Sequence, residues 1–343
     1  MPQTTIPKQR IIWPDNLRAL ATVAVVVLHV SSSILYEWGK VSSSDWWTGN
    51  IYDSLVRWCV PVFLMVTGAL LIPKQDTFAE IIANRIGKLI VPFAFWSLIY
   101  LINSLYIQII QDNEMSISQC FVYIAKSLYH GTSYHLWYIY VLLGIYLLLP
   151  TISKNLNLLS DKNLLYIILL WMLILCLNYI PSLHFKPLAF VGYVGYAVFG
   201  FYLFKVSINN IMAFLMLAAG LAITAYGTFY LSNQQKGFNE MLYNYNTPHI
   251  AIMAAGVFIL AKNETKNYNN KWFVKIRNVI AQKSLGVYLI HVLILEILNK
   301  FGIDWFYLEP LLSIPFTAMV CLIISTTIVY YGSKSQVGKY IFG

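Results

Sequence analysis

The sequence predicts an all-α fold, a polytopic membrane helical bundle of about ten transmembrane helices with both termini in the cytoplasm. Of its 343 residues, 59% are hydrophobic and only 11% are charged, whereas soluble domains carry roughly 25% charged residues. The charges occur in short islands between apolar runs of about 20 residues, the length that an α-helix needs to cross a bilayer. The sequence shows no internal repeat and no additional soluble domain, so residues 1–343 are predicted to form one integral membrane domain.

Each apolar run of suitable length predicts one transmembrane helix. The runs that begin at 135 and at 246 are short, so about nine or about eleven helices are the alternatives to ten. The predicted helices cover residues 17–35, 54–72, 86–110, 135–150, 163–180, 187–205, 209–231, 246–261, 284–300 and 311–332.

The lysine and arginine residues between these helices predict the orientation of the chain. With ten helices, sixteen of the 23 basic residues fall on the side that holds both termini and five on the other. The remaining two, Arg18 and Arg57, lie inside predicted helices. Because short cytoplasmic loops carry the excess of Lys and Arg, the richer side is predicted to be cytoplasmic. The formal charge of +9 therefore reflects membrane topology, and we expect no nucleic-acid partner.

The cysteines and histidines do not have the spacing of a metal site. The four cysteines form no CxxC pair, and no two histidines have the HxxxH or HExxH spacing of a helical metal centre. We therefore expect neither a disulfide framework nor a bound metal.

Aromatic residues gather in the segments predicted to face the outside, among them Trp38, Trp46, Trp47 and Tyr134. Tryptophan and tyrosine are enriched where helices meet the membrane surface, so interfacial anchoring explains them. Aromatic rings beside amides and carboxylates also suit sugar rings. A carbohydrate-binding surface is therefore the alternative interpretation.

The first predicted helix contains ionisable residues that are costly inside a membrane. Arg18 and His29 are eleven residues apart, which places them within about 20° of one helix face and about 16 Å apart along the axis. Arg18 could bind phosphate near the cytoplasm, with Asp15 orienting it and His29 deeper in the bilayer. Alternatively, Arg18 extends to the headgroups and His29 is a hydrogen-bonded core residue.

Further candidates lie on later helices. Arg85 and Lys88 share a face at the start of the third predicted helix, where they either flank the membrane or contact phosphate. His291 lies near mid-membrane, with Tyr288 one turn earlier on the same face. His135 lies near the outer side, and an acceptor pocket would need such polar groups in the outer half of the bundle.

The order of these blocks resembles acyltransferase family 3. Its first-helix signature is an arginine, ten residues and a histidine after a D-N/G-L-R type sequence, as in Asp15 to Arg18 and His29 here. The similarity continues in the blocks VPVFLMVTGALL, RIGKLIVPFAFWSLIY, YHLWYIYVLLGIYLLLP and SLGVYLIHVLIL, from about residue 11 to about 295. The chain most resembles compact members without a fused extracytoplasmic domain, including the type that acetylates enterobacterial common antigen.

The resemblance implies an inner-membrane enzyme that transfers an acetyl or other short acyl group from acyl-CoA to a hydroxyl. The acceptor would be a surface polysaccharide or a lipid-linked glycan. The resemblance also implies that His29 is catalytic and that Arg18 is its partner at the donor entrance. The second residue of the basic pair is often arginine in the family but is Lys88 here, which keeps the charge and loses the bidentate geometry.

The expected mechanism is general base catalysis. Acyl-CoA would bind with its phosphates near Arg18, Arg85 and Lys88, and His29 would deprotonate the acceptor hydroxyl. We expect the acceptor and the thioester carbonyl to be positioned by the following residues: His135, Trp137, Tyr138, Tyr288 and His291. A covalent acyl-histidine and, as a different class of protein, a transporter or flippase for a lipid-linked sugar remain open.

Overall fold

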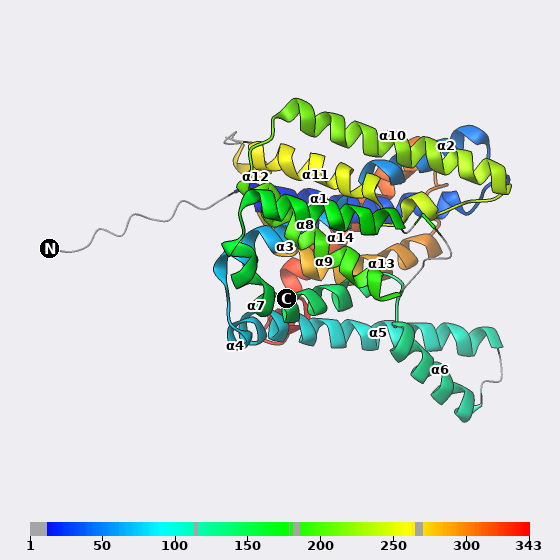
Figure 1. Cartoon of the computed structure of the whole chain (residues 1–343). Helices are drawn as coiled ribbons and strands as arrows, with labels where there is room; N and C mark the ends of the chain where they lie inside the picture. The colour runs from blue at the N-terminus through cyan, green and yellow to red at the C-terminus, as the bar shows by residue number, and fades with distance from the viewer. Residues whose placement is uncertain (1–11, 113–115, 178, 181–185, 265–269) are drawn as a thin grey trace.

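The computed structural model describes residues 12–112, 116–177, 179–180, 186–264 and 270–343. Every regular element within these residues is helical, and most of the helices run alongside one another in one bundle (Figure 1). The helices are α1 (Trp13–Leu35), α2 (Ser43–Val56), α3 (Cys59–Leu71), α4 (Phe78–Ile81), α5 (Gly87–Asp112), α6 (Ile117–His130), α7 (Trp137–Leu158), α8 (Asp161–Leu177), α9 (Lys186–Lys205), α10 (Asn210–Gln235), α11 (Pro248–Asn263), α12 (Lys271–Gln282), α13 (Ser284–Lys300), α14 (Pro310–Gly332) and α15 (Gly338–Ile341).

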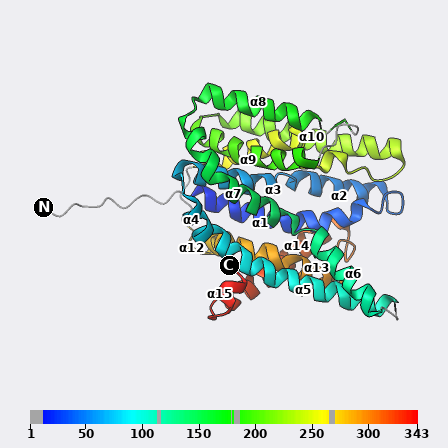
Figure 2. The ribbon, with the colours of Figure 1, turned by 60° about the horizontal axis from the view of Figure 1, so that its bottom comes forward.

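The start of α1, the short helices α4 and α15, and α12 lie toward one end of the bundle (Figure 2). We call this the basic end, because Arg18, Arg85 and Lys88 belong to it. The start of α2 lies at the opposite end, and α6 points away from the bundle there.

Each of the ten predicted transmembrane segments contains a helix. Six described helical segments are long and apolar enough to cross a membrane, and a seventh qualifies if the bent pair α12 and α13 forms one span. Another predicted segment forms a shorter apolar helix among the described residues, residues 189–205 of α9. The described part of the chain is therefore that of a membrane-embedded helical protein. The count of ten and the orientation of the termini remain predictions.

The largest difference from the prediction concerns residues 43–53, which we expected to form part of an outer loop. They form most of α2, which begins where the Ser42 hydroxyl accepts a hydrogen bond from the Asp45 backbone amide at 3.1 Å. Trp46 is only 3% exposed, and its indole N–H donates to the Leu35 carbonyl at 3.1 Å. Trp46 therefore packs in the core between α1 and α2, and for this residue the expectation of an interfacial anchor was wrong.

Close packing of α3 against α9 depends on glycine. A Cβ atom on Gly68 would collide with the backbone of Ala197, and a Cβ atom on Gly200 would collide with the backbone of Met65. Small residues allow helices to approach closely in membranes, where apolar side chains gain little by leaving lipid. These two glycines therefore fix α9 against α3, which contributes Cys59, Val60 and Phe63 to the cavities described below.

Helix α1 is central in the bundle. It contacts α2, α3, α11, α12, α13 and α14. Its residues Leu17, Ala21 and Ile34 are fully buried. Residues of α1 consequently face several internal surfaces at once, including the candidate site.

Candidate functional site

Three histidines from distant parts of the chain converge inside the bundle. His29 comes from α1, His135 from the segment before α7, and His291 from α13. The ring centroids of His29 and His291 are 5.1 Å apart, those of His135 and His291 are 5.3 Å apart, and those of His29 and His135 are 6.4 Å apart. We call these three residues the histidine cluster. Such grouping of ionisable side chains at membrane depth is a functional candidate.

Hydrogen bonds orient two of the three rings. The Nδ1 atom of His291 lies 2.6 Å from the Tyr288 carbonyl oxygen, which can only accept, so Nδ1 carries the proton and Nε2 of the neutral ring carries a lone pair. The Nδ1 atom of His135 lies 2.9 Å from the Ser133 hydroxyl. The Nε2 atoms of His135 and His291 are both buried, and neither has a hydrogen-bond partner among the described residues. The cluster thus presents two nitrogen atoms that are available to a bound molecule.

Tyrosine rings enclose the cluster. The ring of Tyr134 is 5.3 Å from that of His29, and the ring of Tyr100 is 5.1 Å from that of His135. The Tyr288 hydroxyl donates to the His135 carbonyl oxygen. The Tyr100 hydroxyl donates to the Leu289 carbonyl oxygen at 2.9 Å. These contacts link the segment before α7 to α5 and α13, so the position of His135 depends on all three.

A small cavity of about 40 Å³ adjoins His29. It is lined by apolar residues of α1 and α3 and by aromatic residues of the segments that follow. The lining residues are Val25, Leu28, His29, Cys59, Val60, Tyr134, His135, Trp137, Tyr138, Tyr245 and Tyr288.

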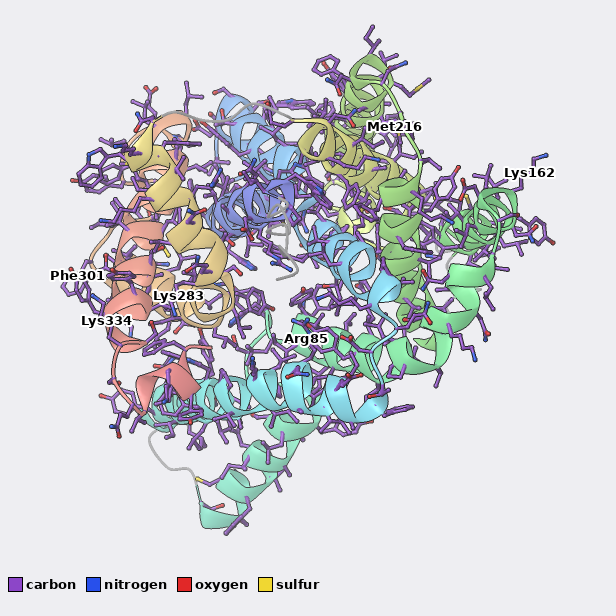
Figure 3. All side chains as sticks on the ribbon, turned by 90° about the vertical axis from the view of Figure 1, so that its left-hand side faces the viewer. Arg85, Lys162, Met216, Lys283, Phe301 and Lys334 are labelled. Atoms are coloured by element: carbon purple, nitrogen blue, oxygen red, sulfur yellow. The ribbon has the colours of Figure 1, made fainter. Side chains whose placement is uncertain are left out.

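A larger cavity of about 260 Å³ lies at the basic end. Its wall contains the three cations Arg18, Arg85 and Lys88. Figure 3 views this end of the bundle and shows Arg85 pointing toward the interior, whereas Lys162 points outward. The Nε atom of Arg85 is buried and has no hydrogen-bond partner among the described residues. We call this space the cationic cavity.

The cationic cavity and the cavities beside the histidine cluster share lining residues. Tyr288 and Tyr138 line both the cationic cavity and the cavity beside His29. Tyr288 also lines a third space of about 10 Å³, in which His291 faces Phe63. Phe63 in turn lines the cationic cavity. The three spaces therefore adjoin one another through shared lining residues between the basic end and the histidines, and we call this series of adjoining cavities the passage.

The predicted site residues fall into two groups in the structure. The first group surrounds the histidine cluster: His29, His135, Trp137, Tyr138, Tyr288 and His291. The second group lines the cationic cavity and comprises Arg18, Arg85 and Lys88. Asp15 lies beside the second group, with its Oδ1 atom 3.9 Å from Nη1 of Arg18. The structure brings these residues together, and their chemical roles remain predictions.

The prediction missed a buried ion pair behind the histidine cluster. Arg57 bonds to Asp53, whose side chain is fully buried. The guanidinium carbon of Arg57 lies 4.2 Å from the ring centroid of Tyr243 and 5.7 Å from that of Tyr245. Tyr245 lines the cavity beside His29, so the Arg57 guanidinium lies just outside this cavity, against Tyr245. The spacing of Asp53 and Arg57, four residues apart next to an apolar run, could have indicated this pair.

Fold and site together define a membrane-embedded helical protein in which a buried histidine cluster and a cationic cavity share lining residues. The family model for an acyltransferase domain matches residues 11–331, which is nearly the whole chain. The chain therefore belongs to acyltransferase family 3. Comparison with curated proteins and with solved structures found no match.

Proposed function

We propose that this protein transfers an acyl group, most simply acetyl, from acyl-CoA to a hydroxyl of a surface polysaccharide or lipid-linked glycan. Membership of the acyltransferase family supports the reaction class. The observation that carries the proposal is the passage, a series of adjoining cavities that lies between three cations at the basic end and three histidines within the bundle. The basic end would face the cytoplasm of a cell whose inner membrane holds the protein.

The donor fits the cationic cavity by charge. Acyl-CoA carries phosphate groups at one end and a thioester at the end of a long, thin arm. Arg18, Arg85 and Lys88 would bind the phosphates through charge-assisted hydrogen bonds. The arm would then follow the passage to His29, about 16 Å further along α1.

The reaction proceeds by proton transfer and acyl transfer. His29 accepts the proton of the acceptor hydroxyl, and the hydroxyl oxygen attacks the thioester carbonyl carbon. The tetrahedral intermediate collapses with cleavage of the carbon–sulfur bond, and the departing thiolate takes the proton from His29. The products are an ester and free coenzyme A. A neutral imidazole suits this role because its ordinary pKa lies near 6.5.

The other two histidines divide the remaining tasks by their hydrogen bonds. His291 has its lone pair on Nε2, so it can accept a hydrogen bond from a second hydroxyl of the acceptor sugar and hold the reacting hydroxyl beside His29. If the Ser133 hydroxyl donates to Nδ1 of His135, Nε2–H of His135 becomes a donor for the thioester carbonyl oxygen. Trp137 and Tyr138 would position the sugar.

A covalent alternative uses the same residues. His29 would attack the thioester itself, and the acyl-imidazole would then react with the glycan. A transporter or flippase for a lipid-linked sugar would also need polar groups inside the membrane. The family match favours the enzyme over the transporter.

The test replaces His29 by Gln, which keeps most of the side-chain volume. Surface glycans are compared by mass spectrometry in cells that contain the wild type, the His29→Gln variant or no copy of the gene. We expect the gene-dependent ester to disappear with His29→Gln, because loss of a general base costs about 10²- to 10⁴-fold in rate. The mass difference identifies the acyl group and the glycan, with enterobacterial common antigen as one candidate.

The matched control is His249→Gln. His249 is also buried, but it bonds to Tyr179 at 2.6 Å and to the Leu242 carbonyl at 2.9 Å, outside the histidine cluster. This variant should retain the ester at equal abundance of protein in the membrane. An undiminished ester in the His29→Gln cells would refute the assignment of His29.

A further inference from the structure

A further cavity, larger than the three of the passage, lies on the other side of α1. It has a volume of about 690 Å³, within the 300–1,000 Å³ typical of ligand sites. We call it the lateral groove. It is lined by residues of α1, α2, α10, α11 and α12 and by Trp58: Asn16, Leu17, Ala19, Leu20, Val23, Ala24, Val27, Leu55, Val56, Trp58, Leu217, Val257, Leu260, Ala261, Glu264, Phe273, Ile276, Arg277 and Ile280.

The lateral groove is separate from the passage because it uses the opposite face of α1. At 100° per residue, Asn16, Leu20 and Val27 lie between about 160° and 200° from Arg18 around the helix axis. His29 lies only about 20° from Arg18 by the same measure. Arg18 and His29 do not line the lateral groove, so an occupant of this groove would not occupy the donor site.

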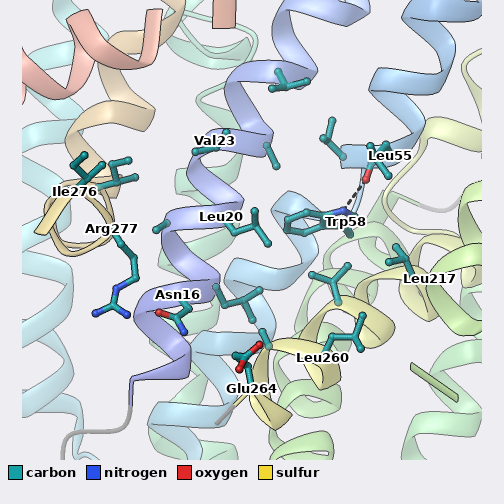
Figure 4. A pocket seen from close by; sticks show the side chains of 18 of the residues that line it. Asn16, Leu20, Val23, Leu55, Trp58, Leu217, Leu260, Glu264, Ile276 and Arg277 are labelled. Atoms are coloured by element: carbon teal, nitrogen blue, oxygen red, sulfur yellow. Dashed lines mark hydrogen bonds between the residues drawn. The ribbon is translucent and has the colours of Figure 1, made fainter. Parts of the chain in front are cut away.

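The length of the lateral groove matches one leaflet of a membrane. From Asn16 to Val27 the wall of α1 rises about 16 Å, and half of a hydrocarbon core of about 30 Å is about 15 Å. In Figure 4, the side chains of Asn16, Glu264 and Arg277 gather at the lower end of the groove, and apolar side chains line the part above. The groove thus has a polar end at the level of α12 and an apolar part about as long as the hydrocarbon region of one leaflet.

The polar end is formed in part by a helix with the properties of a membrane-surface element. Helix α12 is bent by 81° from α13, so it lies across the bundle axis at the basic end. Its apolar residues Trp272 and Ile276 are 73% and 56% exposed. Lys271, Lys275 and Arg277 lie on the same helix. An amphipathic helix with basic residues binds in the membrane interface and attracts anionic lipids.

Three side chains at this end suit a phosphate with a hydroxylated headgroup: Arg277, Asn16 and Glu264. Arg277 donates from Nε and Nη2 to the Asn278 side-chain oxygen at 3.3 Å and 2.9 Å, which holds the guanidinium at the groove. The Oδ1 atom of Asn16 is buried and has no hydrogen-bond partner among the described residues. Arg277 can bind a phosphate oxygen, while Asn16 and Glu264 can accept hydrogen bonds from headgroup hydroxyls.

We propose that the lateral groove binds one anionic glycerophospholipid of the leaflet at the basic end. Its phosphate contacts Arg277, its headgroup hydroxyls face Asn16 and Glu264, and one acyl chain runs along Leu20 and Val23. The basic residues of α12 favour an anionic headgroup over a zwitterionic one. This site is independent of the acyl transfer reaction, since it lies on the far side of α1.

Native mass spectrometry of the purified full-length protein tests the proposal, with dioleoyl-phosphatidylglycerol and dioleoyl-phosphatidylcholine as probes. The wild type should retain one molecule of the anionic lipid in preference to the zwitterionic one. Leu20→Trp should fill the groove and weaken retention about fiftyfold, the effect of excluding roughly three methylene groups. Leu20 is 51% exposed, so the larger side chain need not disturb the core. Arg277→Gln should reduce the preference for the anionic lipid about fivefold.

Leu98→Trp is the matched control, because Leu98 is 54% exposed on α5 and does not line the lateral groove. It should bind the anionic lipid as the wild type does. Equal retention by Leu20→Trp and Leu98→Trp would overturn the proposal. So would a wild type without preference between the two lipids, or a polyprenyl-linked glycan recovered from the protein in place of a glycerophospholipid.

Discussion

Replacing Arg85 by Gln should weaken the binding of acyl-CoA without unfolding the protein. Arg85 lines the cationic cavity, and its buried Nε atom has no hydrogen-bond partner among the described residues. The substitution therefore removes no hydrogen bond that Arg85 makes to the other described residues, and its cost should fall on the complex with the donor. A hydrogen bond to a charged group contributes about 1.5–3 kcal/mol, which corresponds to about 10- to 150-fold in affinity. Because Arg18 and Lys88 line the same cavity, we expect about tenfold.

The assay compares two donors that share the reactive arm and the thioester. Acetyl-CoA carries a phosphorylated nucleotide at the other end of the arm, whereas acetyl-pantetheine lacks this nucleotide and all of its phosphates. Arg85→Gln should lower kcat/KM for acetyl-CoA about tenfold, mainly through KM, and should leave kcat/KM for acetyl-pantetheine nearly unchanged. Lys162→Gln is the control, because Lys162 is a cation that points away from the bundle and does not line the cavity.

An equal loss with both donors would refute the phosphate contact. The defect would then lie in folding or in the reaction step, which both donors share. An unchanged KM for acetyl-CoA in the Arg85→Gln variant would also contradict the assignment of the cationic cavity to the donor. Loss of activity in the Lys162→Gln control would indicate a general effect of charge at the membrane surface.

Two further substitutions test the framework of the site. Tyr288→Phe removes the hydrogen bond to the His135 carbonyl, which contributes about 0.5–1.5 kcal/mol net. In steady-state kinetics we expect kcat to fall about 2- to 13-fold, with KM for the donor unchanged. An unaltered kcat would exclude this positioning role. Gly68→Ala forces a Cβ atom into the backbone of Ala197 and should destabilise the fold by about 1–3 kcal/mol, measured as a lower Tm in detergent. The control is Gly237→Ala, which has nothing within 4 Å of the added atom and should leave Tm unchanged. Equal Tm values for the two variants would contradict the glycine packing.

The transmembrane helices could be predicted because hydrophobic length is a local property of the sequence. Each of the ten predicted ranges contains an observed helix, from Trp13–Leu35 to Pro310–Gly332. Helices α2 and α12 could not be found in this way, because polar residues divide their apolar residues into short groups. Helix α12 reads as a basic loop when only Lys and Arg are counted, and its apolar face shows only on a helical projection.

The site could be predicted where two residues share one helix. The separation of Arg18 and His29 on α1 follows from helical geometry alone. The approach of His135 and His291 to within 5.3 Å of each other depends on how α7 and α13 pack, and no spacing along the chain encodes that distance. The ion pair of Asp53 and Arg57 was missed because Asp53 was assigned to the outer loop, just before the predicted helix that contains Arg57.

The sequence of α1 can be explained by two environments that the helix must satisfy at once. One face carries Arg18 and His29, and these costly ionisable groups line the cationic cavity and the cavity beside His29 instead of the lateral groove. The opposite face carries Leu20, Val23 and Val27, and it lines a groove that is almost entirely apolar. A charge moved from the first face to the second would meet acyl chains instead of a ligand. Because the ionisable residues Arg18 and His29 lie on one face of α1 and apolar residues lie on the other, the proposed donor route and the proposed lipid site are separated by the thickness of one helix.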